Sequence, residues 1–158
     1  MEIQEVKNYY DENCQKEWER LDRHPFEFIF TTYMMDKYIH DGDKVLDIGG
    51  GPGRYSIYYA LKKCDVTLVN LSKGNIDLAR QKAKENHVSF PMIVGNCLDI
   101  DTMDIGTYDH VFLMGPLYHL VDENERKKAV KLAMDRLKPG GFFYCSFILD
   151  FAGIIYDL

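Results

Sequence analysis

A run of small residues in the first half of the chain has the composition of a ligand-binding turn. The segment reads Lys44-Val45-Leu46-Asp47-Ile48-Gly49-Gly50-Gly51-Pro52-Gly53-Arg54-Tyr55. Because glycine has no Cβ atom, backbone N–H groups in such a turn can come close to a ligand. The N-terminus of a following helix adds unpaired donors and a partial positive charge. We therefore expect a cofactor site here, with the acid Asp47 beside it.

A second group of reactive side chains, Tyr118 and His119, lies in the segment Gly115-Pro116-Leu117-Tyr118-His119-Leu120. A neutral histidine can take a proton from an acceptor amine or hydroxyl. The alternative is that His119 packs on the next helix, and the sequence leaves both open. The four cysteines contain no C-x-x-C pair, which favours free thiols in a reducing cytoplasm. No cluster has metal-ligand spacing, so we expect no metal site.

Alternating strands and helices must position these residues. We predict strands over residues 45–48, 66–69, 88–94, 109–114 and 142–149, and helices over 54–63, 73–86 and 122–137. This alternation predicts a parallel sheet with right-handed crossovers. Pro91 has no N–H for a ladder, so the third strand should be an edge, as in the order 3-2-1-4-5. The expected fold class is α/β: a three-layer, doubly wound, mostly parallel sheet that binds ligand at its carboxyl edge.

The N-terminal residues read as a helix over residues 2–21 and a second helix from Pro25. The second helix carries an aromatic stripe, which we expect to pack against the sheet: Phe26, Ile29, Phe30, Tyr33, Met34, Lys37 and Tyr38. A sharper alternative is that the first helix folds over the cofactor as a lid. The side chains that would then touch ligand are Tyr9, Tyr10, Trp18 and Arg20.

The spacing of the glycine turn separates two classes of cofactor. The dinucleotide fingerprint is G-x-G-x-x-G/A. Counted from Gly49 its third small residue falls on Arg54, and counted from Gly51 it falls on Ser56. The pattern present is Asp-x-Gly-x-Gly-x-Gly, which resembles the first motif of the class I S-adenosylmethionine (SAM) dependent methyltransferases. An NAD-binding oxidoreductase is therefore disfavoured.

Three later segments resemble the same family over roughly residues 40–150. Asn70 ends the second predicted strand, where the family holds the ribose hydroxyls of SAM. The segment Val94-Gly95-Asn96-Cys97-Leu98-Asp99 resembles the stretch beside the adenine. The pieces Tyr108-Asp109-His110-Val111, Gly115–Leu120 and Leu137-Lys138-Pro139-Gly140-Gly141 resemble the fourth motif and the "L-K-P-G-G" turn. The resemblance implies a Rossmann-like methyltransferase fold and methyl transfer from SAM, which leaves S-adenosylhomocysteine (SAH).

Carried over residue by residue, the resemblance assigns two sets of site residues. The cofactor-binding set is Asp47, Gly49, Gly50, Gly51, Asn70, Leu71, Asn96, Cys97, Met114 and Gly115. Within it, Asp47 either bonds the α-amino group of SAM or only braces the turn. The catalytic set is Tyr118 and His119, on the acceptor side.

The chain departs from the family's pattern in three places. Asn70 and Asn96 stand where the family usually or often has an acid. An amide oxygen accepts fewer and weaker bonds than a carboxylate, and we expect a loss of about 1–2 kcal/mol at the ribose. Asp99 could supply an acid near the adenine or be a solvated loop residue. The family's last two strands form a hairpin beside strand five, and residues 151–158 are too short for it.

Length and charge set the remaining expectations. With 158 residues we expect one SAM-binding domain over 1–158: helices over 1–40, a core over 41–150, and 151–158 as the start of a truncated C-terminal region. A second copy of the chain could cover the strand-five edge as a homodimer. The net charge of −6 disfavours nucleic acid as a partner, and no apolar run is long enough to span a membrane. The favoured acceptor is a small molecule, and a SAM- or SAH-binding module without turnover is the alternative.

Overall fold

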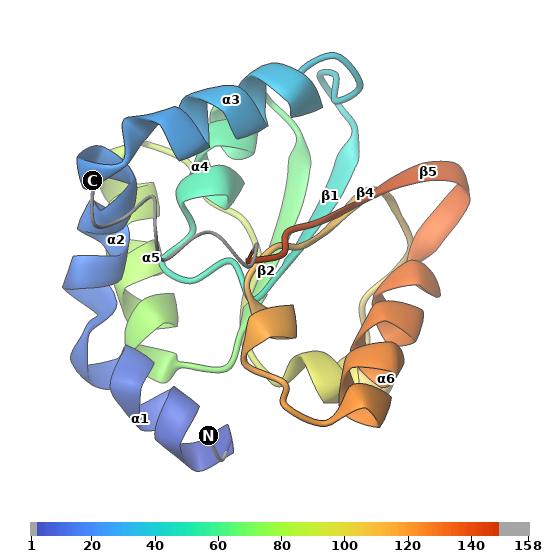
Figure 1. Cartoon of the computed structure of the whole chain (residues 1–158). Coiled ribbons are helices and arrows are strands. Elements are labelled where there is room, and N and C mark those ends of the chain that lie inside the picture. The colour runs from blue at the N-terminus through green and yellow to red at the C-terminus, as the bar shows by residue number, and fades with distance from the viewer. Residues whose placement is uncertain (1–2, 149–158) are drawn as a thin grey trace.

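Five parallel strands form one sheet in the order β3-β2-β1-β4-β5 (Figure 1). The computed structural model describes residues 3–148. Its strands are β1 Lys44–Ile48, β2 Asp65–Asn70, β3 Met92–Val94, β4 Tyr108–Leu113 and β5 Leu137–Cys145. Its α-helices are α1 Ile3–Glu12, α2 Cys14–Arg23, α3 Pro25–Met35, α4 Arg54–Leu61, α5 Lys73–Glu85 and α6 Glu123–Met134, and two 3-10 helices are η1 Cys97–Thr102 and η2 Pro116–Tyr118. The predicted order 3-2-1-4-5 is confirmed.

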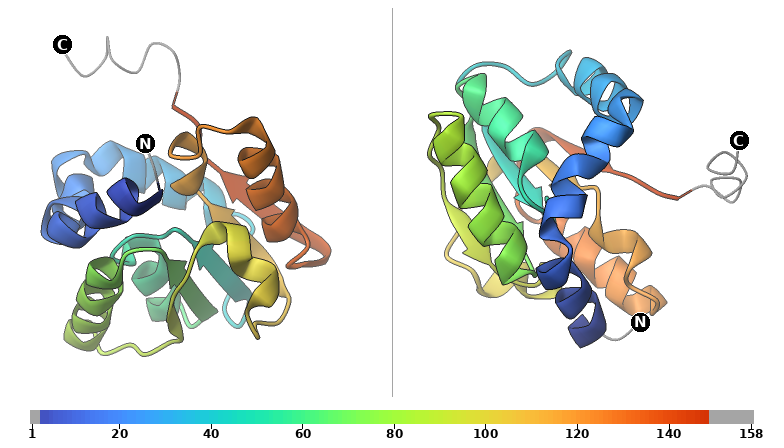
Figure 2. Two further views of the ribbon diagram at one scale, coloured as in Figure 1. Left: turned by 90° about the horizontal axis from the view of Figure 1, so that it is seen from below. Right: turned by 90° about the vertical axis from the view of Figure 1, so that its left-hand side faces the viewer.

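Helices cover both faces of the sheet, which gives three layers (Figure 2). Met35 of α3 and Tyr59 of α4 pack on one face, and Ile76 of α5 adds a smaller cluster beside them. Ala129 of α6 and Ile100 of η1 pack on the other face. The central strands β1, β2 and β4 are buried on both sides, as expected of a parallel sheet enclosed by crossover helices.

The register places the carboxyl ends of the central strands at one edge. Asp47 pairs with Leu68 and Phe112, and Asn70 pairs with Val94. Beyond the strands, the N–H of Gly49 donates to the carbonyl oxygen of Val69 over 2.7 Å. The turns that follow β1, β2, β3 and β4 therefore meet at this edge. In residues 3–148 no helix is long and apolar enough to cross a bilayer.

The N-terminal region differs from the prediction of one helix over residues 2–21. The helix is interrupted at Asn13, whose backbone angles are φ −118° and ψ 20°. Glu2 lies outside the described residues. The break lets α1 and α2 take different directions over the carboxyl edge (Figure 1). Asparagine competes for backbone hydrogen bonds and so is a natural place for such a break.

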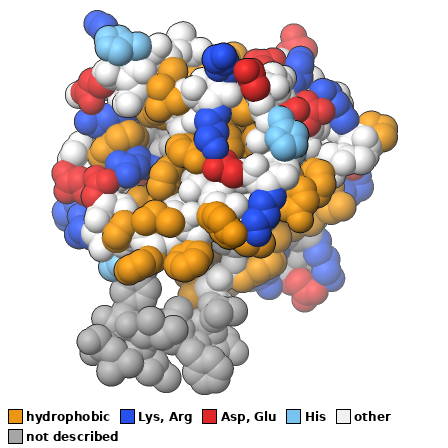
Figure 3. Space-filling view, turned by 90° about the horizontal axis from the view of Figure 1, so that it is seen from above, with side chains coloured by type: hydrophobic (Ala, Val, Ile, Leu, Met, Phe, Trp, Pro, Cys, Tyr) orange, Lys and Arg blue, Asp and Glu red, His pale blue; other side chains and the backbone are white. Residues whose placement is uncertain are grey.

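The prediction that the aromatic stripe of α3 packs against the sheet was wrong. The stripe is exposed, with 46–72% of Phe26, Ile29, Phe30, Tyr33, Met34 and Tyr38 accessible. Figure 3, which looks down on the molecule from above Figure 1, shows apolar side chains on this surface. The helix instead buries Thr32 and Met35. Since α3 is apolar on most of its circumference, helical spacing did not determine which side faces the core.

Two predicted strands also had wrong boundaries. The third strand was placed at 88–94, but β3 begins only after Pro91, which cannot donate to a ladder. The fifth was placed at 142–149 after a helix reaching 137. Instead α6 ends at Met134 and β5 begins at Leu137, with a register shift opposite Tyr108 and His110. Residues 149–158, including the predicted C-terminal region 151–158, lie outside the described residues.

Candidate functional site

A cavity of about 1340 Å³ opens at the carboxyl edge of the sheet. Its walls come from α1, α2, the glycine turn, the ends of β2 and β3, and the segment after β4. All twelve residues that the sequence assigned to cofactor binding or catalysis line this cavity: Asp47, Gly49, Gly50, Gly51, Asn70, Leu71, Asn96, Cys97, Met114, Gly115, Tyr118 and His119. The fold thus brings the predicted residues together, while their roles remain predictions.

The glycine turn leaves no room for a side chain at Gly49 or Gly50. Gly49 and Gly51 have positive φ angles of 74° and 56°, a conformation that glycine adopts without strain. A Cβ atom at Gly50 would lie 2.2 Å from an oxygen of Asp47, and one at Gly49 would lie 2.5 Å from Pro116. The turn is therefore packed between β1 and the segment after β4.

Asp47 lies beneath the turn and is almost fully buried. Its Oδ2 accepts a hydrogen bond from the hydroxyl of Ser56 in α4, over 2.7 Å. Burial raises the pKa of Asp47 to about 6, and the Ser56 bond opposes this. The carboxyl is thus a group that a positively charged ligand group, such as an α-amino group, would stabilise in its ionised form. Sequence reasoning missed Ser56, and its place in the first turn of the helix after the glycines was the available signal.

The ribose candidate Asn70 is already engaged by the protein. Its Oδ1 accepts the N–H of Gly51 over 3.2 Å, and the side chain is buried. The amide oxygen therefore ties the end of β2 to the glycine turn. The N–H groups on Nδ2 of the Asn70 side chain are the part left for a ligand.

The adenine candidates lie at the end of β3. The side chain of Asn96 caps η1, because its Oδ1 accepts the N–H of Leu98 over 3.0 Å. Burial raises the pKa of Cys97 to about 11, so its thiol stays protonated at neutral pH. Asp99 is exposed and does not line the cavity. The solvated-loop interpretation of Asp99 therefore fits the structure.

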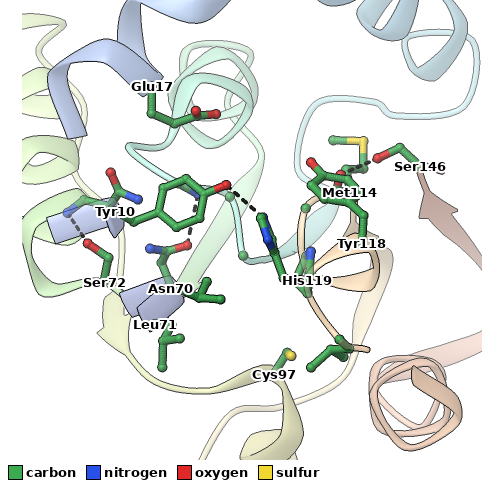
Figure 4. Close-up of a pocket in the computed structure, with 18 of the residues that line it drawn as sticks. Tyr10, Glu17, Asn70, Leu71, Ser72, Cys97, Met114, Tyr118, His119 and Ser146 are labelled. Atoms are coloured by element: carbon green, nitrogen blue, oxygen red, sulfur yellow. Dashed lines mark hydrogen bonds between the residues drawn. The ribbon is translucent and has the colours of Figure 1, made fainter. Parts of the chain in front are cut away.

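The catalytic candidates come from the segment after β4. Tyr118 is 43% exposed, and His119 is half-buried. The Nε2 atom of His119 lies 2.8 Å from the hydroxyl oxygen of Tyr10 in α1, and Figure 4 shows the two side chains pointing toward one another. Burial lowers the pKa of His119, and nearby Glu17 opposes the shift. At neutral pH His119 is therefore an uncharged imidazole that can accept a proton.

The four side chains proposed to form a lid divide into two pairs. Tyr10 and Arg20 line the cavity. Tyr9 is 57% exposed and does not line it. Trp18 also lies outside the lining, and its ring instead packs against the guanidinium of Arg54 at 4.6 Å.

Arg20 is held by two acids that the sequence analysis missed. Its Nε donates to Glu17 over 2.9 Å, and its Nη1 donates to Glu27 of α3. The three-residue spacing of Glu17 and Arg20 on one helix was the signal available. Within residues 3–148, no group of three or more His, Cys, Asp or Glu side chains could hold a metal ion.

Comparisons with known proteins agree with this geometry. Residues 45–141 match the model of a methyltransferase domain family. A ubiquinone biosynthesis O-methyltransferase from Bordetella avium is 31% identical over 105 residues, covering 66% of this chain and 42% of that protein. Its counterpart from Coxiella burnetii is 29% identical over 133 residues, covering 82% and 54%. The chain thus spans about half the length of these curated relatives.

A solved structure supports the same assignment at the level of the fold. A TehB-like SAM-dependent methyltransferase from Corynebacterium glutamicum superimposes with a TM-score of 0.72 at 24% identity, covering 89% of this chain and 73% of that one. The family match covers more than half of the chain and begins in β1, directly before the glycine turn. The chain therefore belongs to the class I SAM-dependent methyltransferase family.

Proposed function

We propose that this protein transfers a methyl group from SAM to a hydroxyl group of a small-molecule acceptor. The observation that carries the proposal is one cavity with two unlike ends: the glycine turn over Asp47 at one end and the Tyr10–His119 pair at the other. A single-ligand pocket usually has about 300–1000 Å³. The cavity of about 1340 Å³ therefore has room for a cofactor and a small acceptor together.

The residues of the first end fit SAM. The backbone of Gly49, Gly50 and Gly51 would receive the amino-acid part, because a Cβ atom at Gly49 or Gly50 would collide with its neighbours. Asp47 would face the α-amino group. Asn70 would meet the ribose through its free amide donors. We propose that Leu71, Asn96, Cys97, Met114 and Gly115 complete the adenine and sulfonium surroundings.

The chemistry asks little of the protein beyond alignment and one proton transfer. SAM supplies a methyl group on a sulfonium with a neutral thioether as leaving group. The protein must hold the acceptor oxygen in line and take its proton. His119 is placed for this as an uncharged base at the acceptor end. Hydroxyl acceptors are favoured because both relatives are named O-methyltransferases.

A SAM- or SAH-binding module without turnover is the alternative, and one observation favours it. The side-chain oxygens of Asn70 and Asn96 are both bonded to backbone N–H groups of the protein itself. They therefore offer less to the cofactor than the carboxylates they replace. This would weaken binding of SAM and SAH without removing the site.

Two measurements separate these functions. Calorimetric titration of the 158-residue chain with SAH should show micromolar binding, with none for NAD as control. Transfer of radiolabelled methyl from SAM to a panel of small phenols, with catechol as the reference, should then show turnover. Binding without any transfer would favour the module, and binding of neither ligand would contradict both proposals.

We further propose that residues 1–158 act as one domain that pairs with a second copy along the edge of β5. Support comes from the sheet order: within residues 3–148 β5 is an edge strand, and an edge strand presents backbone groups that a strand of another chain can pair with. Light scattering coupled to size-exclusion chromatography should give twice the monomer mass, and a monomer would contradict the pairing. The four free thiols support the cytoplasm as the compartment, which cell fractionation would test.

A further inference from the structure

We propose that Tyr10 of α1 is a catalytic residue that passes the acceptor's proton to His119. This inference rests on the proposed function. It concerns a side chain that lies 109 positions away from His119 in the sequence. The N-terminal helix would then complete the reaction centre in addition to covering it.

The chemistry of the two groups fixes the direction of the hydrogen bond between Tyr10 and His119. The hydroxyl oxygen of Tyr10 lies 2.8 Å from Nε2 of His119, and the rings meet edge to face with 5.4 Å between their centroids. A phenol is a stronger donor than a neutral imidazole, and an imidazole nitrogen is a stronger acceptor than a phenol oxygen. Tyr10 therefore donates to Nε2, which leaves the histidine proton on Nδ1.

Tyr10 and His119 are both uncharged at neutral pH. Burial raises the pKa of Tyr10 far above its ordinary value, with nearby Glu17 acting in the same direction and Arg20 opposing it. Burial lowers the pKa of His119 while Glu17 opposes the shift. Of the charged groups that face the pair from α2, Arg20 is already bonded to Glu17 and Glu27. The pair is therefore neutral at pH 7, with one proton in the hydrogen bond between the two rings.

In the free protein, Nε2 of His119 is already occupied by the hydroxyl of Tyr10. An acceptor hydroxyl that gives its proton to this nitrogen directly would have to displace Tyr10. An acceptor that bonds to the Tyr10 oxygen needs no such displacement, because a phenol oxygen has free lone pairs while it donates. Both Tyr10 and His119 line the cavity, and Figure 4 shows the Tyr10 ring extending into the site from the side of α1. Proton transfer through Tyr10 therefore requires less rearrangement of the site than direct transfer to His119.

Hydrogen bonds to the start of α5 hold α1 in the position that the Tyr10–His119 contact requires. Next to Tyr10, the Oδ1 atom of Asp11 accepts the hydroxyl of Ser72 over 2.6 Å and the N–H of Gly74 over 2.9 Å. These bonds lower the pKa of Asp11. A Cβ atom at Gly74 would lie 2.9 Å from the backbone oxygen of Asp11. The N-terminus of α5, directly after the cofactor strand β2, thus holds the helix that carries Tyr10.

The O–H bond of the acceptor breaks, its proton moves to Tyr10, and the proton of Tyr10 moves to Nε2 of His119. The electron pair stays on the acceptor oxygen, which forms the new bond to the methyl carbon. The pair of the broken carbon–sulfur bond stays on sulfur. The positive charge passes to the imidazolium, which later releases its proton to water.

The first test measures the tautomer of His119 in the free chain and needs neither cofactor nor acceptor. Nitrogen NMR of the imidazole should show Nδ1 protonated and Nε2 as the acceptor in the wild type. In Tyr10→Phe the proton should shift toward Nε2, while Tyr9→Phe, the matched control at an exposed neighbour, should change nothing. A wild-type ring protonated on Nε2, or an unchanged ring in Tyr10→Phe, overturns the proposal.

The second test is kinetic, with catechol as the acceptor. Tyr10→Phe should lower kcat by about 100-fold or more, the usual size of a proton-transfer contribution, and leave SAH affinity within about twofold of wild type. Tyr9→Phe should keep the wild-type kcat. A Tyr10→Phe variant with nearly full kcat overturns the relay. A wild-type chain that binds SAH and methylates no phenol contradicts the proposed function, and with it the relay that rests on it, whatever the tautomer of His119.

Discussion

The two ends of the cavity are built in different ways. At the cofactor end, Asp47, Ser56 and the glycines belong to one strand–turn–helix unit, and the Asp47–Ser56 bond spans nine positions of sequence. At the acceptor end, Tyr10 and His119 come from segments 109 positions apart in the sequence. The first end is set by local structure, whereas the second depends on how α1 docks. Changes at the two ends should therefore separate cofactor binding from turnover.

The largest effect is expected at Gly50. In Gly50→Ala the new methyl group would lie 2.2 Å from the buried carboxylate of Asp47, so the turn must move. We expect SAH affinity to fall by about 100-fold, which corresponds to about 2.8 kcal/mol of binding free energy, together with about 1–3 kcal/mol of stability. Gly106→Ala is the matched control, since a Cβ atom there meets nothing within 4 Å. An unchanged SAH affinity in Gly50→Ala would show that the turn does not bind the cofactor.

The second largest effect is expected at Asp47, where a substitution should stabilise the fold while weakening cofactor binding. Because folding raises the pKa of Asp47 from 3.8 to about 6, its protonated form is favoured in the folded state. Its contribution to stability is complete below about pH 4 and is lost as the pH rises through about 6. The total loss is about 3 kcal/mol. Asp47→Asn should remove this fall, which urea unfolding between pH 4 and 8 would measure, while SAH binding weakens. Parallel pH curves for the two proteins would contradict the burial argument.

A third change should strengthen the local end. In Asn70→Asp one carboxylate oxygen can keep the bond from Gly51, and the second becomes free for a ribose hydroxyl. We expect SAH to bind about 5–30 times more tightly, which corresponds to about 1–2 kcal/mol. Calorimetry against wild type checks this gain. Equal or weaker binding would mean that Asn70 only braces the turn.

The smallest expected effect on global stability is at the docking of α1. Asp11→Ala removes the acceptor of the Ser72 and Gly74 bonds and should cost about 0.5–2 kcal/mol, as other helix caps do. Amide exchange should accelerate in α1 and stay unchanged in β1, with turnover falling more than SAH affinity. Glu12→Gln, at an exposed neighbour, is the control. Equal exchange in α1 of both proteins would show that Asp11 does not hold the helix.

The same division explains what the sequence could predict. The strand order and the glycine turn depend on local patterns, and the structure confirms them. Pro91 indicated an edge strand and also shortened it. The outward face of α3 was mispredicted because a helix that is apolar on most sides has no preferred inward face in sequence.

The Tyr10–His119 contact was beyond prediction for a different reason. The lid hypothesis named Tyr10 but gave it no partner, because the pairing depends on the break at Asn13 and on the docking of Asp11. Both are decided by tertiary structure. The partners of Asn70 and Asn96 were equally hidden, since a spacing pattern does not show that an amide oxygen is already bonded.

The packing around Trp18 has a practical consequence. This is the single tryptophan of the chain, and two cations lie over its ring, Arg54 at 4.6 Å and Lys82 at 5.2 Å. Arg54 is the first residue of the helix that follows the glycine turn. Tryptophan fluorescence of the native chain, excited where tyrosine does not absorb, therefore comes from one indole beside the cofactor end, and its emission serves as an unlabelled optical reporter of ligand entry and of α2 leaving its place.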